Sequence, residues 1–543
     1  MDRRVFLKAI ASASVAASIP FAPLHARRPF AADYLSLHPF VDKHPEAVFI
    51  MRTSVSAKTA TEEKLEAGRK FASRVFQKSA TPGIPFDWNI ALKPNLTCTS
   101  GTGGSDDGMG IRTDIPFLEG VLLGIADLSF PMNAVSMREG NIMGSGLCPT
   151  EDTIGEADEM AARLGLHYLD FASGRIAREI TYDTMIEGQE VVWTDCPDGV
   201  VFRRIPSVAP FNSERTWLLN IAKFKAHSMG LTLASKNMQG AVMPPFTRFC
   251  ETLEQTRARP QAMLDHFQPD FDTQVETLYQ QHRGSIPRWD RPGADASGGL
   301  GMESWAQRTC DWLSVQPAGL HVIEGIYGRN GDGFNGGPGS GGTPEEFMSN
   351  ILIFGRNPLL VDVIGNWLGG HEPGNFGLFH IAFQRHLLST FNPAMIPLFL
   401  WNGNDPEPVS LSELTRTPLV TQYLRKEYNG GTEAQYHLVN ESFDYRPYAV
   451  ESTYAPEAFV LGQNHSNPFA SSTIIEYRMH RSGYARLDVF NSSGDRVAVL
   501  ADGWALQGAH VATWNSGTNP PGAYFYRFSS SGFTMTRKMV LVR

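Results

Sequence analysis

The chain has 543 residues, of which 42% are hydrophobic, enough for one large or two medium domains plus a smaller one. Its formal net charge is -9 and only 19% of its residues are charged, so no basic excess is available to neutralise a nucleic acid. The five cysteines lie far apart and form no C-x-x-C pair, which argues against a disulfide framework, a zinc site and an iron–sulfur cluster. We expect these cysteines to be small buried hydrophobic residues.

Residues 1–26 have the anatomy of a signal peptide. Arg3 and Arg4 precede a short apolar stretch, rich in Ala, Ser and Val, that runs to about Pro20. This stretch is too short to cross a bilayer, so we expect no transmembrane helix in the mature protein. The run Arg-Arg-Val-Phe-Leu-Lys at 3–8 resembles the twin-arginine translocation motif. The alternative is a general secretory signal with a chance arginine pair.

Residues 33–448 alternate short apolar runs with helical patterns, which is typical of an α/β domain with a mainly parallel sheet and flanking helices. The apolar runs predict buried strands at 90–92, 134–137, 217–221, 320–323, 351–354 and 397–401. The helical patterns predict helices at 61–78, 154–164, 231–238 and 359–368. Residues 244–310 have weak periodicity and many polar residues, so we expect a helical insertion or lid there, with a glycine-rich return linker at 298–301.

Polar side chains follow several predicted strands at the point where each strand ends. Lys93 and Asn95 follow the strand at 90–92, whereas Lys223, Lys225 and His227 follow the strand at 217–221. Ligands of open α/β sheets bind outside the carboxyl ends of the strands. If the sheet is parallel, these side chains therefore meet at one edge of it.

The chemistry of these residues favours an anionic ligand. Lysine is a point charge suited to a phosphate or carboxylate, and histidine can be a ligand or a proton donor near neutral pH. The candidate ligand-binding residues are Lys93, Asn95, Lys223, Lys236 and Asn237, and the candidate catalytic residues are Lys225, His227 and Asp362. The alternatives are a solvated strand end, a salt bridge from Lys93 to Glu139 or Glu324, and for Asp362 a buried lysine partner.

A glycine-rich loop follows the strand at 320–323 and contains two carboxylates, Glu324 and Asp332. The loop fits neither the P-loop pattern nor G-x-G-x-x-G, so it is a weak phosphate-binding signal. Carboxylates are ligands for Mg²⁺ and other hard cations. A second interpretation is therefore a divalent metal that Glu324 and Asp332 hold and that bridges to the anion. The alternative is a surface loop with solvated charges.

Several ordered motifs carry a family resemblance. They are Leu-Lys-Pro-Asn at 92–95 and the segments 219–227, 230–240, 323–343 and 354–362. Together they resemble the landmarks of the domain of unknown function 362 family. The resemblance implies an α/β fold and, because members are often joined to ferredoxin-like cluster domains, a redox association. This chain has no cysteine-rich cluster segment, which argues against carrying over an electron-transfer role.

From about residue 459 the sequence changes to short alternating runs separated by Gly and Pro turns, typical of a small antiparallel β-sandwich over 459–543. The predicted strands are 472–479, 485–490, 497–500, 510–514, 522–529 and 536–542. The segments 461–469, 522–527 and 537–543 resemble those of a type IX secretion C-terminal sorting domain. That resemblance implies an immunoglobulin-like fold that serves secretion and attachment. The alternative is an accessory adhesive sandwich.

Two functional hypotheses follow. The first is an exported enzyme that binds an anionic substrate or cofactor, with or without a metal ion. The sequence does not specify its reaction. The second is a non-catalytic cell-surface protein that binds a ligand or glycan and is displayed through its C-terminal module. Both predict passage through the periplasm to the cell surface or the medium, with twin-arginine and type IX export machineries as partners.

Overall fold

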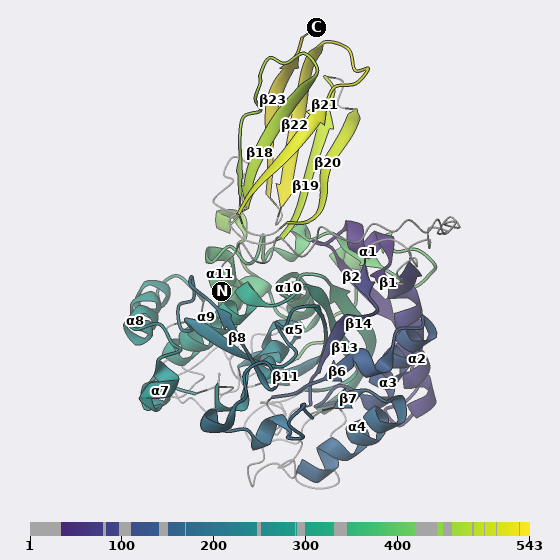
Figure 1. Ribbon diagram of the computed structural model, residues 1–543. Helices are drawn as coiled ribbons and strands as arrows, with labels where there is room; N and C mark the ends of the chain where they lie inside the picture. Colours follow the sequence, from purple (N-terminus) through teal and green to yellow (C-terminus); the bar gives the residue numbers. More distant parts are fainter. Residues whose placement is uncertain are drawn as a thin grey trace, which may run out of the picture.

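The computed structural model describes residues 34–79, 83–96, 110–140, 150–168, 170–227, 229–246, 251–287, 289, 299–330, 345–419, 442–448, 459–479, 483–492, 495–505, 508–530 and 533–542. The predicted signal peptide at 1–26 and Asp332 lie outside these residues. The described chain forms a large α/β core and a C-terminal module of β-strands (Figure 1).

The core is built on a sheet to which the described residues contribute nine strands, in the order β16-β15-β2-β14-β13-β10-β5-β6-β7. They are β2 (Val48–Arg52), β5 (Asn89–Pro94), β6 (Val135–Met137), β7 (His167–Tyr168), β10 (Thr216–Lys223), β13 (Gly319–Asn330), β14 (Glu345–Gly355), β15 (Leu398–Leu400) and β16 (Glu407–Pro408). The strands from β7 to β13 are mutually parallel, and β15 is parallel to β2. The two antiparallel members are β14 and β16. The predicted α/β fold with a mainly parallel sheet is confirmed.

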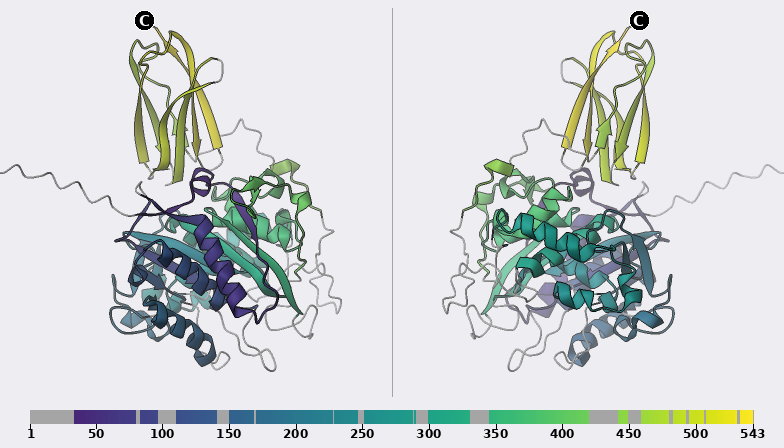
Figure 2. Two further views of the ribbon diagram at one scale, coloured as in Figure 1. Left: turned by 90° about the vertical axis from the view of Figure 1, so that its right-hand side faces the viewer. Right: turned by 90° about the vertical axis from the view of Figure 1, so that its left-hand side faces the viewer.

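Helices cover both faces of this sheet (Figures 1 and 2). Alternate residues of a strand point to opposite faces, and the core accordingly divides into two buried clusters. One cluster includes Ile90, Leu92 and apolar side chains of α2 (Thr61–Val75), α3 (Ile115–Asp127) and α4 (Thr150–Leu164). The other includes Ala91 and side chains of α5 (Ala234–Asn237), α9 (Gly299–Val315), α10 (Pro358–Leu368) and α11 (Gly377–Gln384). Burial on both faces explains why the central strands are continuous apolar runs.

Two sequence predictions in the core are wrong. The helix expected at 231–238 begins only with α5, because the residues before it form β12 (Gly230–Thr232), which pairs with β11 (Lys225–His227). The linker prediction at 298–301 is wrong for the last three residues, because α9 begins at Gly299. Between these segments lie α6 (Leu253–Arg257), α7 (Gln261–Leu264) and α8 (Phe271–His282).

The C-terminal module contains two antiparallel sheets. One has the order β17-β18-β21 and the other β20-β19-β22-β23. Their bounds are β17 (Phe459–Leu461), β18 (Ser472–Met479), β19 (Gly483–Phe490), β20 (Arg496–Ala505), β21 (Gly508–Asn515), β22 (Gly522–Ser530) and β23 (Phe533–Leu541). Buried side chains from both sheets form one hydrophobic cluster, to which the alternation in β18 and β22 contributes every second residue. All six strands predicted here are confirmed.

Two further expectations concern the chain as a whole. Cys196 and Cys310 are buried and not joined in a disulfide, as expected of small hydrophobic residues, while the other three cysteines lie outside the described residues. In the part of the chain that the structure describes, none of the helices has the length and apolar character needed to cross a membrane.

Candidate anion-binding site

The register of β10 and β13 places Lys223 beside Glu324 at the centre of the sheet. Lys223 Nζ lies 2.7 Å from Glu324 Oε2, and neither side chain is exposed to solvent. The same carboxylate accepts hydrogen bonds from the backbone N–H groups of Asp114 (3.2 Å) and Ile326 (2.9 Å). Both Glu324 oxygens are thus engaged within the protein. This arrangement favours a structural role for the two residues, whereas the sequence suggested a metal ligand and a ligand-binding lysine.

A second buried ion pair lies at the end of β5. Lys93 Nζ is 2.7 Å from Glu139 Oε2 and also donates to Pro94 O and to Asn237 Oδ1. Burial lowers the pKa of Lys93, while the charge of Glu139 opposes that shift. A Cβ atom on Gly240 would lie 2.0 Å from Glu139 Oε1, so only glycine leaves room for this pair. The structure thus shows the salt bridge that was the alternative to ligand binding by Lys93.

Side-chain amides connect the strand ends to α5. Asn237 Oδ1 accepts from Asn95 Nδ2 at 3.0 Å, and Asn237 Nδ2 donates to Asn220 Oδ1 at 2.7 Å. Lys225 Nζ donates to Asn95 Oδ1 at 3.3 Å and to the carbonyl oxygen of Ile111. Four of the predicted site residues, Lys93, Asn95, Lys225 and Asn237, therefore belong to one hydrogen-bonded network.

Lys225 of this network, His227 and Lys236 act on one another electrostatically. Burial lowers the pKa of Lys225 well below its ordinary value, and the nearby charges of Lys236 and Lys223 lower it further. The pKa of His227 is likewise well below its ordinary value, because of burial and then the charges of Lys236 and Lys225. His227 is therefore neutral at pH 7. Its Nδ1 accepts from the N–H of Met229 at 3.1 Å, which places the ring proton on Nε2.

Lys236 differs from the other lysines of the site in being partly exposed. Within the described ranges, no residue forms a hydrogen bond or ion pair with its ammonium group. Its charge nevertheless acts on both Lys225 and His227. Like charges held close together repel one another unless an anion lies between them. Lys236 is thus the best placed of these residues to meet a ligand from solvent.

Asp362 lies on α10 and caps α5, the short helix that carries Lys236 and Asn237. Its two carboxylate oxygens accept from the backbone N–H groups of Ala234 (2.7 Å) and Ser235 (2.9 Å). Burial raises the pKa of Asp362 to about 7, against the effect of these hydrogen bonds. Asp362 is buried, and its partners are backbone groups rather than the buried lysine that was the alternative. We therefore describe it as a positioning residue.

Sequence reasoning missed two polar residues of the network. Asn220 lies in the middle of β10, fully buried, and its Nδ2 donates to Ala234 O. Thr113 accepts from the N–H of Asn95 at 2.8 Å and donates to Ile221 O at 2.7 Å. The signal for Asn220 was visible, because a polar residue inside an apolar strand needs a buried partner. No local pattern identifies Thr113.

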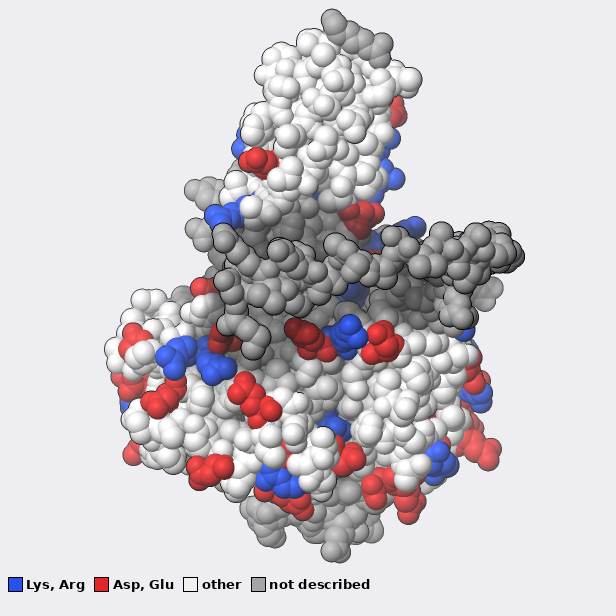
Figure 3. Space-filling view, viewed as in Figure 1, with Lys and Arg blue, Asp and Glu red and all other residues white. Residues whose placement is uncertain are grey.

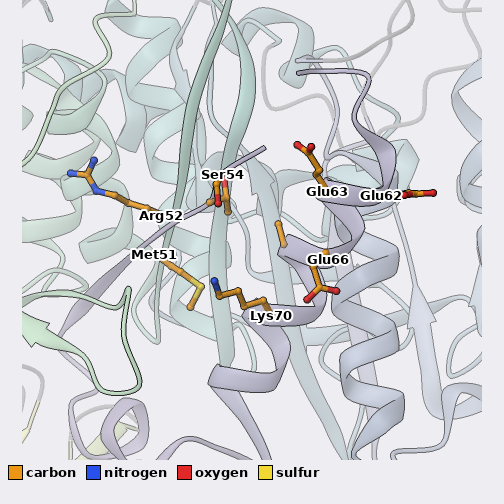
Figure 4. A pocket seen from close by; sticks show the side chains of 9 residues that line it. Met51, Arg52, Ser54, Glu62, Glu63, Glu66 and Lys70 are labelled. Atoms are coloured by element: carbon orange, nitrogen blue, oxygen red, sulfur yellow. The ribbon is translucent and has the colours of Figure 1, made fainter. Parts of the chain in front are cut away.

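Two surface pockets lie away from this network. A pocket of about 340 Å³ lies between the end of β2 and α2, and Figure 4 shows Glu62, Glu63, Glu66 and Lys70 of α2 along it. A second pocket, of about 240 Å³, is lined by Lys64, Asp114 and their neighbours. Figure 3 shows basic and acidic side chains interspersed over the described surface in that view. Lys93, Lys223 and Lys225 of the candidate site are buried and so do not contribute to the charged surface.

The predicted metal site has less support. Asp332 lies outside the described residues, and Glu324 forms the buried ion pair with Lys223. Among the residues that the structure describes, no group of three or more His, Cys, Asp or Glu side chains is arranged to hold a metal ion.

Fold and site together define an α/β protein with a mainly parallel sheet and a cluster of buried lysines and amides at the carboxyl ends of its strands. The family model described as Domain of unknown function (DUF362) matches residues 90–366, just over half of the chain. The chain belongs to this family, as its motifs indicated. The matched region contains every predicted site residue, from Lys93 to Asp362. No curated protein matches the chain.

Proposed function

We propose that the core binds an anionic small molecule, a substrate or a cofactor, beside Lys225, His227 and Lys236. The observation that carries this proposal is the hydrogen-bonded link from Lys225 through Asn95 to Asn237, the residue that follows Lys236 on α5. The charge of Lys236 also lowers the pKa of both Lys225 and His227. A bound anion relieves this repulsion and makes charge-assisted hydrogen bonds with the ammonium groups.

The three residues have different roles in this proposal. Lys236 supplies a charge that solvent can reach, and His227 supplies an Nε2–H donor. Lys225, whose pKa is lowered, gives up its proton more readily than an ordinary lysine. We propose that the protein is an enzyme in which Lys225 and His227 exchange protons with the ligand. Binding that is retained without any turnover would support the second hypothesis, a non-catalytic surface protein.

Replacing Lys236 by glutamine is expected to weaken anion binding by about 10- to 100-fold, since a charged hydrogen bond contributes about 1.5–3 kcal/mol. Isothermal titration calorimetry of the full-length chain with a panel of acetate, sulfate and phosphate measures the effect. Lys70→Gln on α2 is the matched control, because Lys70 is exposed and lines a different pocket. Equal affinities of Lys236→Gln, Lys70→Gln and wild type would contradict the proposal.

We also propose that the protein is exported through its N-terminal signal and then displayed or released through a C-terminal sorting β-sandwich. The motif at 3–8 and the alternating strands after 459 support this proposal. Changing Arg3 and Arg4 together to lysine is expected to retain the protein in the cytoplasm, which fractionation and immunoblotting measure. Unchanged export of this variant would indicate the general secretory route instead.

A further inference from the structure

The last residues of β13 lie against the backbone of the candidate site. Phe224 N donates to Glu324 O at 2.9 Å, and from there β13 continues alongside the chain that leads into β11. A Cβ atom on Gly328 would lie 2.4 Å from Phe224 O, so the two backbones approach as closely as glycine permits. Arg329 and Lys225 follow Gly328 and Phe224 in the chain, so the segments that carry them lie side by side.

Arg329 is buried, and its charge acts on Lys225, whose pKa it helps to lower. Its Nη2 lies 3.3 Å from Glu346 Oε1, and the same carboxylate binds Lys58 Nζ at 3.0 Å. One carboxylate is thus shared between two cations. Lys225 of β11 and Arg329 of β13 thus lie on neighbouring segments, and the charges of Arg329 and of Lys236 on α5 both act on Lys225.

We propose that this site takes a phosphoryl group, as free phosphate or a phosphate monoester, and that Arg329 is a further residue that binds it. The inference rests on the anion-binding function proposed above and specifies the class of anion. Several basic residues on neighbouring elements suit a compact dianion better than a monocarboxylate. The planar guanidinium of arginine matches the oxygens of phosphate, and lysines supply point charges around them.

Calorimetry with the full-length chain at constant ionic strength tests this inference, with inorganic phosphate, phenyl phosphate and acetate as probes. We expect phosphate or its ester to bind at least about 10-fold more tightly than acetate, and Arg329→Gln to remove most of that preference. Tighter binding of phenyl phosphate than of inorganic phosphate would identify a phosphate monoester as the ligand. Tighter binding of inorganic phosphate would identify the free ion. Arg69→Gln is the control, because Arg69 forms an exposed pair with Asp127 on the outer helices.

The possible failures are distinguishable. Equal binding of phosphate and acetate, both weakened by Lys236→Gln and neither by Arg329→Gln, would overturn this inference and leave the anion site standing. No binding of any of the three probes would overturn both. Arg329→Lys keeps the positive charge but lacks the planar guanidinium group. This variant is used for the test if Arg329→Gln does not fold. We expect Arg329→Lys to lose only part of the phosphate preference, and full retention of that preference would remove Arg329 from the site.

Discussion

Replacing Lys223 by methionine is expected to destabilise the folded core by about 3–5 kcal/mol, because it leaves a buried carboxylate without its counter-charge. Glu324 is fully enclosed at the centre of the sheet, where the register of β10 and β13 holds the pair together. The two backbone hydrogen bonds that Glu324 accepts cannot replace a positive charge. Urea unfolding of the wild type and the variant measures the difference.

Two further variants decide whether burial causes the loss. In Arg69→Met the pair with Asp127 is broken where both side chains are about half exposed (46% and 52%), so we expect a change of at most about 1 kcal/mol. The double variant Lys223→Met/Glu324→Gln removes both charges and keeps an acceptor oxygen, so we expect it to be more stable than Lys223→Met alone. A loss in Lys223→Met no larger than that in Arg69→Met would contradict this explanation.

Replacing Asp362 by alanine is expected to destabilise the fold by about 2–4 kcal/mol, since two buried N–H groups lose their acceptor. Anion affinity is expected to fall as well, because α5 carries Lys236 and Asn237. Asn357→Ala is the matched control, because Asn357 caps α10 in the same way through the N–H groups of Leu359 and Leu360. That variant is expected to lose stability by about 1–2 kcal/mol and to keep its anion affinity. If the two variants bind the anion with equal affinity, Asp362 does not position the anion site.

The same carboxyl group predicts a pH dependence. Burial raises the pKa of Asp362 to about 7 in the folded state, whereas an ordinary aspartic acid has a value near 4. The folded state therefore binds the proton more tightly than the unfolded state, and the stability that protonation provides is lost as the pH rises from about 4 through 7. The stability difference between wild type and Asp362→Asn, measured by urea unfolding, is expected to favour the wild type more at pH 5 than at pH 8. An equal difference at both pH values would contradict this assignment.

The elements that could be predicted from the sequence are those that a local pattern of residues defines. The apolar runs identified the central strands, and their alternation identified the six strands of the C-terminal module. The run at 231–234 was misjudged, because an apolar segment of this length fits a strand as well as a helix. Only its pairing with β11 decides the matter, and that pairing is a tertiary property.

The candidate site was predictable to the extent that it lies at strand ends. Lys93, Asn95, Lys225 and Asn237 were predicted separately and lie in one network. The sequence named Glu139 only as one of two possible partners of Lys93, and it did not indicate that Asp362 binds the backbone of α5, because the paired groups are distant in the sequence. The choice between a ligand-binding lysine and a salt-bridged one depends on such distant pairings, so sequence spacing alone left it open.

The main proposal made here for the core is that an anion binds beside Lys236. X-ray diffraction from crystals of the full-length chain soaked in tungstate, a heavy oxyanion, tests it most directly through anomalous scattering from the metal atom. We predict an anomalous peak from a tungstate ion whose oxygens lie within hydrogen-bonding distance of Lys236 Nζ and His227 Nε2. Tungstate bound only elsewhere, for example near Lys70 in the pocket beside α2, would contradict this proposal.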